Sequence, residues 1–280
     1  MKLPFRRTLF APALCWLLFG AFSSAPAQDL ASKGREVFKK YQTTVVTVQL
    51  VLKIKFGVPG LGGDGRESKQ EISGTVIDPS GLTVVALSST DPAGMMQSFM
   101  SLGGDGDDNP KFKMDTELSD VKLLGNDGSE WPAEIVLRDK DLDLAFVRPK
   151  VKPDSPLPAL DLGKNAKVEV LDEVIALNRL GKVAGRAYAV AVERINAVVQ
   201  KPRLFYVPGG DATATGLGCP AFTPDGKLVG IFVMRSIKSA GEGGGGMFGF
   251  QSSPIATIIL PADEVKKVAS QVPAVKEGAK

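Results

Sequence analysis

Short runs of alternating apolar and polar residues dominate this chain. In residues 46–56 every second residue is apolar, and most of the residues between them are polar or charged. A period of two is typical of a β-strand with one face buried and the other exposed. Similar runs follow at EISGTVID, LTVVAL and AEIVL, and turns such as PSG and NDG separate them. The pattern predicts an all-β barrel or sandwich.

A second series of strand-like runs follows a stretch rich in proline. Residues 151–165, VKPDSPLPALDLGKN, are predicted to be a linker. Beyond it the strand-like runs are VEVLDEVIALNRL, GRAYAVAVERINAVVQ, RLFYV and KLVGIFVM. We therefore expect two β units, at residues 43–150 and 166–265. A short N-terminal helix is expected at 28–42, and a C-terminal helix and tail at 266–280.

The first 27 residues have the order of a secretory signal peptide. Three basic residues precede an apolar run from about Leu9 to Phe22, and the segment ends in the small residues APA. Cleavage is expected before Gln28, which predicts an exported protein, periplasmic or extracellular. The alternative is a retained membrane anchor, but the apolar run is shorter than the roughly 18 to 20 residues that a membrane-spanning helix needs.

The charges exclude two classes of partner. Residues 1–27 hold three of the 34 basic residues and none of the 31 acidic ones, which leaves 31 of each in the remaining chain. These basic residues are scattered, so neither a nucleic-acid interface nor a polybasic membrane surface is expected after cleavage. Only Cys219 remains beyond the leader, which excludes an intramolecular disulfide.

The chain contains no histidine. Its absence excludes a Ser-His-Asp triad, a Cys-His dyad, a histidine general base and a histidine-ligated zinc site. A Ser-Lys dyad needs no histidine and stays open as an alternative.

We expect no cofactor and no metal site. GEGGGG at residues 241–246 matches G-x-G-x-x-G in letters, but it does not lie between a strand and a helix, as a dinucleotide-binding loop does. The acidic loop at residues 103–109 offers oxygen ligands for calcium, yet Pro110 stands where an EF-hand loop requires glycine and Thr116 where it requires glutamate. A solvated acidic loop is the favoured interpretation.

Four segments follow one another in an order that points to a known family. They are ISGTVIDPSGLTVVALSS, NDGSEWPAEIVLRDKDLDLAFVRP, VEVLDEVIALNRLGK and TGLGCPAFTPDGKLVGIFV. The third is similar to the family motif L-x-V-G-x-x-V-x-A-I-G-x-P-x-G, and the fourth to G-N-S-G-G-P with its following strand. Together they resemble the trypsin-like, chymotrypsin-fold serine proteases of the HtrA (Deg) type over most of residues 43–265. The resemblance implies two packed antiparallel β-barrels with short terminal helices.

The same resemblance implies that the catalytic triad is degenerate. The family's catalytic histidine falls at Ser88 and its nucleophilic serine at Leu217, while its aspartate is kept as Asp143. Leucine has no nucleophilic atom, and a neutral hydroxyl is not a base near neutral pH. The sequence therefore predicts a pseudoprotease with no intact catalytic residue.

The remaining residues of this region each have two interpretations. Asp143 is expected to be a structural carboxylate hydrogen-bonded to Ser88, and the alternative is a role in a rewired site. Cys219 is expected to be a buried apolar thiol rather than a replacement nucleophile, because no histidine can lower its pKa. Gly216, Gly218 and Cys219 form the loop that we expect to contribute to ligand binding.

The leading hypothesis is an exported peptide- or protein-binding module that acts as a scaffold, a chaperone-like holder or a regulator. Its partner would be a peptide or an unfolded protein lying as an added strand in the cleft between the barrels. One alternative is an active hydrolase with a histidine-free site, and another is a structural envelope protein whose cleft is filled by side chains such as Leu217. Family members often carry a C-terminal PDZ domain, but fewer than 20 residues of this sequence follow the last β segment and its closing helix, so none is expected within it.

Overall fold

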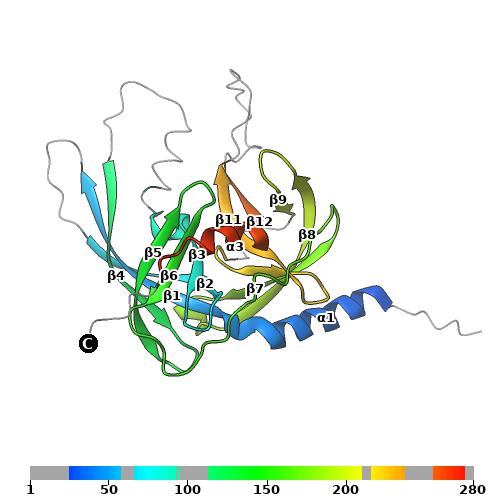
Figure 1. Ribbon diagram of the computed structural model, residues 1–280, viewed down its shortest axis with the longest axis horizontal. Helices are drawn as coiled ribbons and strands as arrows, with labels where there is room; N and C mark the ends of the chain where they lie inside the picture. Colours follow the sequence, from blue (N-terminus) through cyan, green and yellow to red (C-terminus); the bar gives the residue numbers. More distant parts are fainter. Residues whose placement is uncertain are drawn as a thin grey trace, which may run out of the picture.

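Two β-barrels make up most of the molecule. The computed structural model describes residues 25–57, 66–92, 94, 113–209, 216–236 and 255–274. The strands among them form two closed antiparallel barrels that lie side by side (Figure 1). The predicted fold class, an all-β protein with two packed antiparallel barrels and short terminal helices, is confirmed.

The order of the strands around each barrel follows from which strands hydrogen-bond to one another. Barrel 1 has the order β1-β2-β3-β6-β5-β4 and barrel 2 the order β10-β11-β12-β9-β8-β7. The strands of barrel 1 are β1 (Val45–Gly57), β2 (Arg66–Val76), β3 (Thr83–Ala86), β4 (Lys113–Leu124), β5 (Glu130–Asp139) and β6 (Leu144–Pro149). Those of barrel 2 are β7 (Glu173–Arg179), β8 (Tyr188–Val199), β9 (Phe205–Pro208), β10 (Pro220–Phe222), β11 (Leu228–Ser236) and β12 (Ile255–Pro261).

The alternation along β1 places one face in the core of barrel 1. Leu50 and Leu52 are almost completely buried, whereas Lys53 and Lys55 are exposed. A buried leucine side chain stabilises the fold by roughly 1.5–3 kcal/mol relative to an exposed one. The period-two pattern of the sequence is therefore the physical cause of the strand's orientation.

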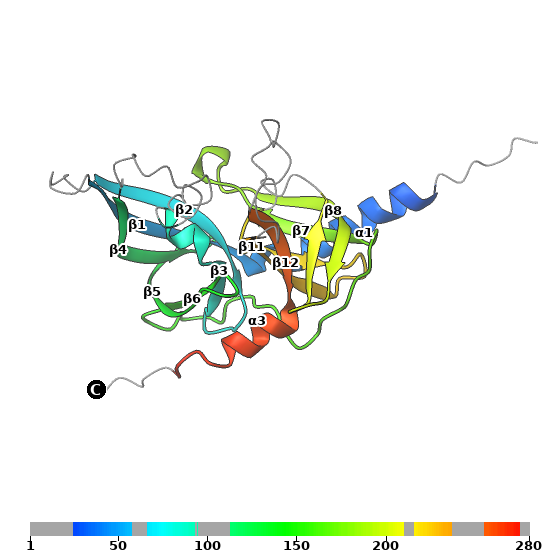
Figure 2. The ribbon, with the colours of Figure 1, turned by 90° about the horizontal axis from the view of Figure 1, so that it is seen from above.

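Two α-helices pack against the outside of the barrels. Helix α1 (Ala25–Tyr41) lies along barrel 2, and its N-terminal end projects beyond the barrels (Figure 2). The ring of Tyr41 stacks on Phe222 of β10 at a centroid distance of 4.6 Å, and its hydroxyl donates to the carbonyl of Gly226. No helix among the described residues is long and apolar enough to cross a membrane.

The C-terminal helix begins before residue 266, within the range given above to the second β unit. Helix α3 (Ala262–Ala269) follows β12 directly. Pro261 adopts an extended conformation before the helix, and the acidic residues Asp263 and Glu264 occupy the first turn, where negative charge is favourable. The local chemistry of the first turn therefore fixes this helix start.

Strand β7 also begins later than the run VEVLDEV suggests. Leu171 adopts a left-handed conformation with φ of 74°, and its N–H donates to the carbonyl of Ile195. A turn therefore interrupts the apolar run, and pairing begins only at Glu173. Leu171 also stands where the quoted family motif has its first glycine, the residue type that adopts such a φ at least cost.

Several predicted features lie outside the described residues. They are most of the predicted signal peptide, the acidic loop at 103–109 and the glycine-rich segment at 241–246.

Candidate functional site

Strand pairing brings Ser88 and Asp143 together. Ser88 begins the short 3-10 helix η2 (Ser88–Thr90) just after β3, and Asp143 directly precedes β6. The last pair between these two strands joins Ala86 to Leu144, so the residues that follow and precede them meet. The N–H of Leu87 donates to the carbonyl of Asp143 at 2.9 Å, which fixes the register at this point.

Three donors hold the Asp143 carboxylate. The backbone N–H of Ser88 donates to Oδ1 at 2.6 Å, and the Ser88 hydroxyl donates to Oδ2 at 2.9 Å. The backbone N–H of Met234, on β11 of barrel 2, donates to Oδ2 at 2.7 Å. The carboxylate of barrel 1 is therefore bonded to both barrels. We call Ser88 and Asp143 the carboxylate half of the site.

Burial and hydrogen bonding act on Asp143 in opposite directions. Burial raises the pKa of its carboxyl group above the ordinary value, and the donors from Met234 and Ser88 offset part of that rise. Within the described part of the chain, Asp143 forms no ion pair with a lysine or arginine. The site thus contains a carboxylate that hydrogen-bond donors support and no described cation neutralises.

Residues 216–219 pack tightly against barrel 1. Gly218 has φ of 82°, and its carbonyl accepts from the Thr75 hydroxyl at 2.7 Å. A Cβ atom at Gly218 would lie 2.6 Å from the carbonyl oxygen of Ser73 and 3.3 Å from the amide nitrogen of Ala86. Only glycine fits this approach. Because Ala86 precedes Ser88 by two residues, the structure brings this segment to the same region as the carboxylate half, and we call residues 216–219 the loop half.

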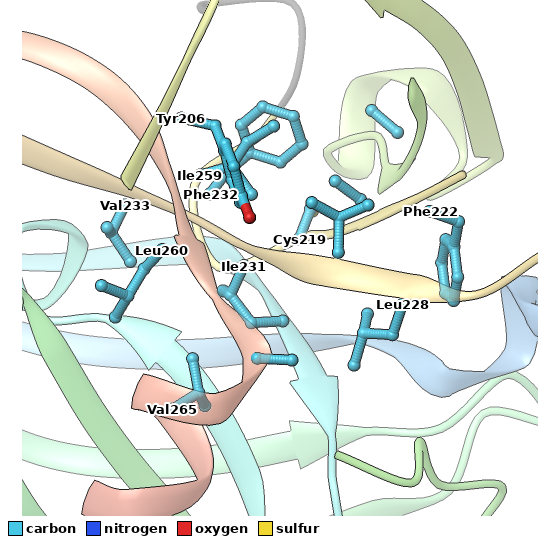
Figure 3. Packing of buried hydrophobic residues seen from close by; sticks show 14 of the residues in the cluster. Tyr206, Cys219, Phe222, Leu228, Ile231, Phe232, Val233, Ile259, Leu260 and Val265 are labelled. Carbon is cyan, nitrogen blue, oxygen red and sulfur yellow. The ribbon is translucent and has the colours of Figure 1, made fainter. Parts of the chain in front are cut away.

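Within the loop half, Leu217 is partly exposed and Cys219 is buried. Figure 3 shows Cys219 among the apolar side chains of the barrel 2 core. Burial raises the pKa of the Cys219 thiol to about 12, although hydrogen bonding to the Ser73 side chain and to the backbone of Arg179 offsets part of the rise. At neutral pH such a group is a protonated thiol, which is a poor nucleophile.

Asn178 is a residue of this site that the sequence reasoning missed. Its Oδ1 accepts from the Ser73 hydroxyl at 3.1 Å and lies 3.2 Å from the Cys219 sulfur. A Cβ atom at Gly216 would lie 2.6 Å from the same oxygen. Asn178 therefore joins strand β2 of barrel 1 to the loop half. In the quoted family motif, Asn178 occupies the position of the glycine in A-I-G. This replacement of a glycine by a polar side chain was the sequence signal that could have identified it.

An ion pair between the barrels was missed as well. Arg186, in the turn between β7 and β8, donates to both carboxylate oxygens of Glu71 on β2, at 2.6 and 3.1 Å. This hydrogen bonding lowers the pKa of Glu71. Nearby, the buried guanidinium of Arg179 donates to the carbonyl of Leu124 and stacks on the Tyr188 ring at 5.3 Å. Two arginines of barrel 2 thus bind barrel 1.

The chemistry of the two halves is limited by the residue types present. The site contains a carboxylate, a hydroxyl, a leucine and a protonated thiol, and no imidazole is available because the chain has no histidine. Among the described residues no group of three or more histidine, cysteine, aspartate or glutamate side chains could hold a metal ion.

Comparison with known proteins places this arrangement in a family. Residues 72–231 match the trypsin-like peptidase domain, a match that includes Ser88, Asp143 and the loop half. No curated protein matches the chain. Because the match covers more than half of the residues and the two barrels agree with it, the chain belongs to the trypsin-like peptidase domain family.

Proposed function

We propose that this chain is an exported, catalytically inactive homologue of the HtrA-type serine proteases that binds peptides or partner proteins. It would serve as a scaffold, a chaperone-like holder or a regulator. One observation carries the proposal: Leu217 stands at the nucleophile position in a chain that has no histidine.

The case for inactivity is chemical. A serine nucleophile needs a base within hydrogen-bond reach to take its proton, and the Ser88 hydroxyl that replaces the imidazole donates its own proton to Asp143. Leu217 offers no atom that could form an acyl intermediate. Loss of the nucleophile or the base in such enzymes lowers kcat on the order of a million-fold.

The case for binding rests on the parts of the fold that do not depend on the nucleophile. Both barrels, their closed strand order and the hydrogen bonds between them remain. In the family that the chain resembles, an extended peptide lies between the barrels and bonds through its main chain. Binding of that kind uses backbone groups and side-chain pockets, so it does not need a serine hydroxyl. Export rests on the leader pattern of residues 1–27.

Hydrolysis of fluorescently labelled casein by the purified protein tests the inactivity. We expect no turnover by the wild type, by Leu217→Ser or by Asp143→Ala, because none of them pairs a nucleophile at position 217 with an imidazole base. Trypsin serves as the positive control for the substrate. Turnover by the wild type that Asp143→Ala abolishes would contradict the proposal and show a histidine-free catalytic site.

Fluorescence anisotropy with the same labelled, unfolded casein tests the binding. We expect a saturable rise in anisotropy for the wild type and an equal rise for Leu217→Ser, which changes the nucleophile position without changing the backbone. Absence of both binding and turnover would contradict a binding role and favour a structural one.

A further inference from the structure

We infer that Ser88 and Asp143 form an acceptor site for a cationic side chain, a lysine ammonium or an arginine guanidinium, supplied by the bound peptide. The inference rests on the proposed peptide-binding function and names the chemistry that such a peptide would carry. It follows from the hydrogen bonds, the charges and the exposure of the carboxylate half.

The hydrogen bonds make this half an acceptor. The Ser88 hydroxyl has one proton and donates it to Oδ2 of Asp143 at 2.9 Å, so its lone pairs can only accept from a ligand. The N–H groups of Ser88 and Met234 also donate to the carboxylate. Donors that converge on a carboxylate favour its ionised form and fix its orientation. A ligand group that meets this pair must therefore donate hydrogen bonds.

The charges leave the carboxylate without a cation. No described lysine or arginine forms an ion pair with Asp143. Arg235, which follows Met234 on β11, places its guanidinium 5.0 Å from the centre of the Phe205 ring instead. An imidazolium is unavailable from any part of the chain, because the sequence has no histidine.

The exposure leaves room for a donor from outside. Ser88 and Asp143 are only partly buried, in contrast to the completely buried Cys219. A charged group in a partly desolvated place is stabilised when an opposite charge approaches it, since the Coulomb interaction is stronger there than in bulk water. A charge-assisted hydrogen bond from a basic side chain would supply that stabilisation.

The contrast with Glu71 supports the assignment. Glu71 also lies where the barrels meet, but Arg186 of the same chain already occupies it through two hydrogen bonds. Of these two carboxylates at the contact between the barrels, Asp143 is the one that the described residues leave open to a ligand's cation.

Four fluorescein-labelled peptides test the inference. They are identical except for one central residue, which is lysine, arginine, methionine or glutamate. We expect the wild-type protein to bind the lysine and arginine peptides about fivefold more tightly than the methionine peptide, the range of a partly exposed ion pair. The glutamate peptide should bind most weakly. The preference should shrink as salt rises, because ions screen the attraction.

Two variants and one control assign the preference to the carboxylate half. Asp143→Asn removes the charge, and Ser88→Ala removes the outward acceptor while leaving Asp143 and its backbone donors in place. Asp143→Asn should lose the preference for the basic peptides, and Ser88→Ala, which keeps the charge, should weaken it. Asp141→Asn removes the same charge from an exposed side chain two residues away and should keep it. Asp141→Asn should also leave the affinity for the methionine peptide unchanged.

The outcomes separate the inference from the proposed function. Equal wild-type affinity for the lysine and methionine peptides would overturn the cation site while leaving peptide binding intact. A preference that survives undiminished in Asp143→Asn would overturn it as well. No binding of any peptide would contradict both the site and the proposed function.

Discussion

The carboxylate half and the loop half lie at the same contact between the barrels, yet they treat their titratable groups differently. Asp143 receives three hydrogen bonds and stays partly exposed. Cys219 is completely buried, and the pKa of its thiol rises to about 12. In both cases burial disfavours the charged form, and the three donors to Asp143 offset part of that effect.

The difference shows that the carboxylate half, rather than the loop half, contains a polar group that a ligand could reach. The loop half contributes packing contacts. Gly218 lies against barrel 1, Asn178 lies beside Gly216, and Cys219 belongs to the core of barrel 2. The carboxylate half still presents a fixed acceptor to solvent. One part of the candidate site thus holds a polar group at the surface while the other part stabilises the contact between the barrels.

The largest effect that we expect from this comparison is the slow alkylation of the Cys219 thiol. In a Cys15→Ala background Cys219 is the only thiol, and its labelling by iodoacetamide at pH 8 reports its ionisation. With a pKa of about 12, we expect labelling about a thousandfold slower than that of an unperturbed cysteine. The same protein unfolded in guanidinium chloride should react at the ordinary rate. Rapid labelling of the folded protein would show that the loop half is open and that the comparison is wrong.

Much of the fold could be predicted because strand patterns are local. Alternation in β1 and glycine-containing turns are encoded within a few residues, and the order of the family motifs supplied the two barrels. Leu171 was harder, since a leucine at φ of 74° contradicts the intrinsic preference of its residue type. There the surrounding structure determines the backbone.

The site was predicted less completely than the fold. Ser88, Asp143 and Leu217 came from the family resemblance, and no local pattern brings them together. Neither Asn178 nor the Glu71–Arg186 pair was found, because each depends on contacts between residues that are far apart in the sequence. Such contacts follow from how the barrels pack, which composition and periodicity do not reveal.

A second test breaks the packing of the loop half. Gly218→Ala places a Cβ atom 2.6 Å from a backbone oxygen of barrel 1 at a left-handed φ, so strain and overpacking add. We expect a loss of about 3 kcal/mol in the free energy of unfolding, measured by urea denaturation. Gly128→Ala is the matched control, because Gly128 has φ of 86° but nothing within 4 Å of the added atom.

The control isolates the contact from the backbone strain. Gly128→Ala should lose only about 1 kcal/mol, the cost of the left-handed conformation alone. Equal losses for the two variants would mean that the loop half does not press against barrel 1, and the contrast between the two halves would disappear.

The smallest effect is expected at Asp143, where the sign of the pH dependence is the test. In Asp143→Asn an amide nitrogen takes the place of one carboxylate oxygen. At the position of Oδ2 it cannot accept from the Ser88 hydroxyl or the Met234 N–H, so we expect a loss of about 1–3 kcal/mol in the free energy of unfolding. Because the pKa of Asp143 is raised in the folded protein, its contribution is complete below the ordinary value of 3.8 and declines as pH rises through the folded-state pKa.

For Glu71→Gln, the loss of unfolding free energy relative to the wild type should change with pH in the opposite direction. Arg186 lowers the pKa of Glu71, so the contribution of Glu71 is present above its ordinary value of 4.5 and is lost as pH falls through the folded-state pKa. Urea denaturation of the wild type and both variants at a series of pH values between about 3.5 and 8 gives the difference in unfolding free energy between the wild type and each variant. The slope of each difference against pH is the quantity to compare. Parallel slopes would contradict the assignment, because they would mean that Asp143 already has an internal cation like Glu71 and offers no charge to a ligand.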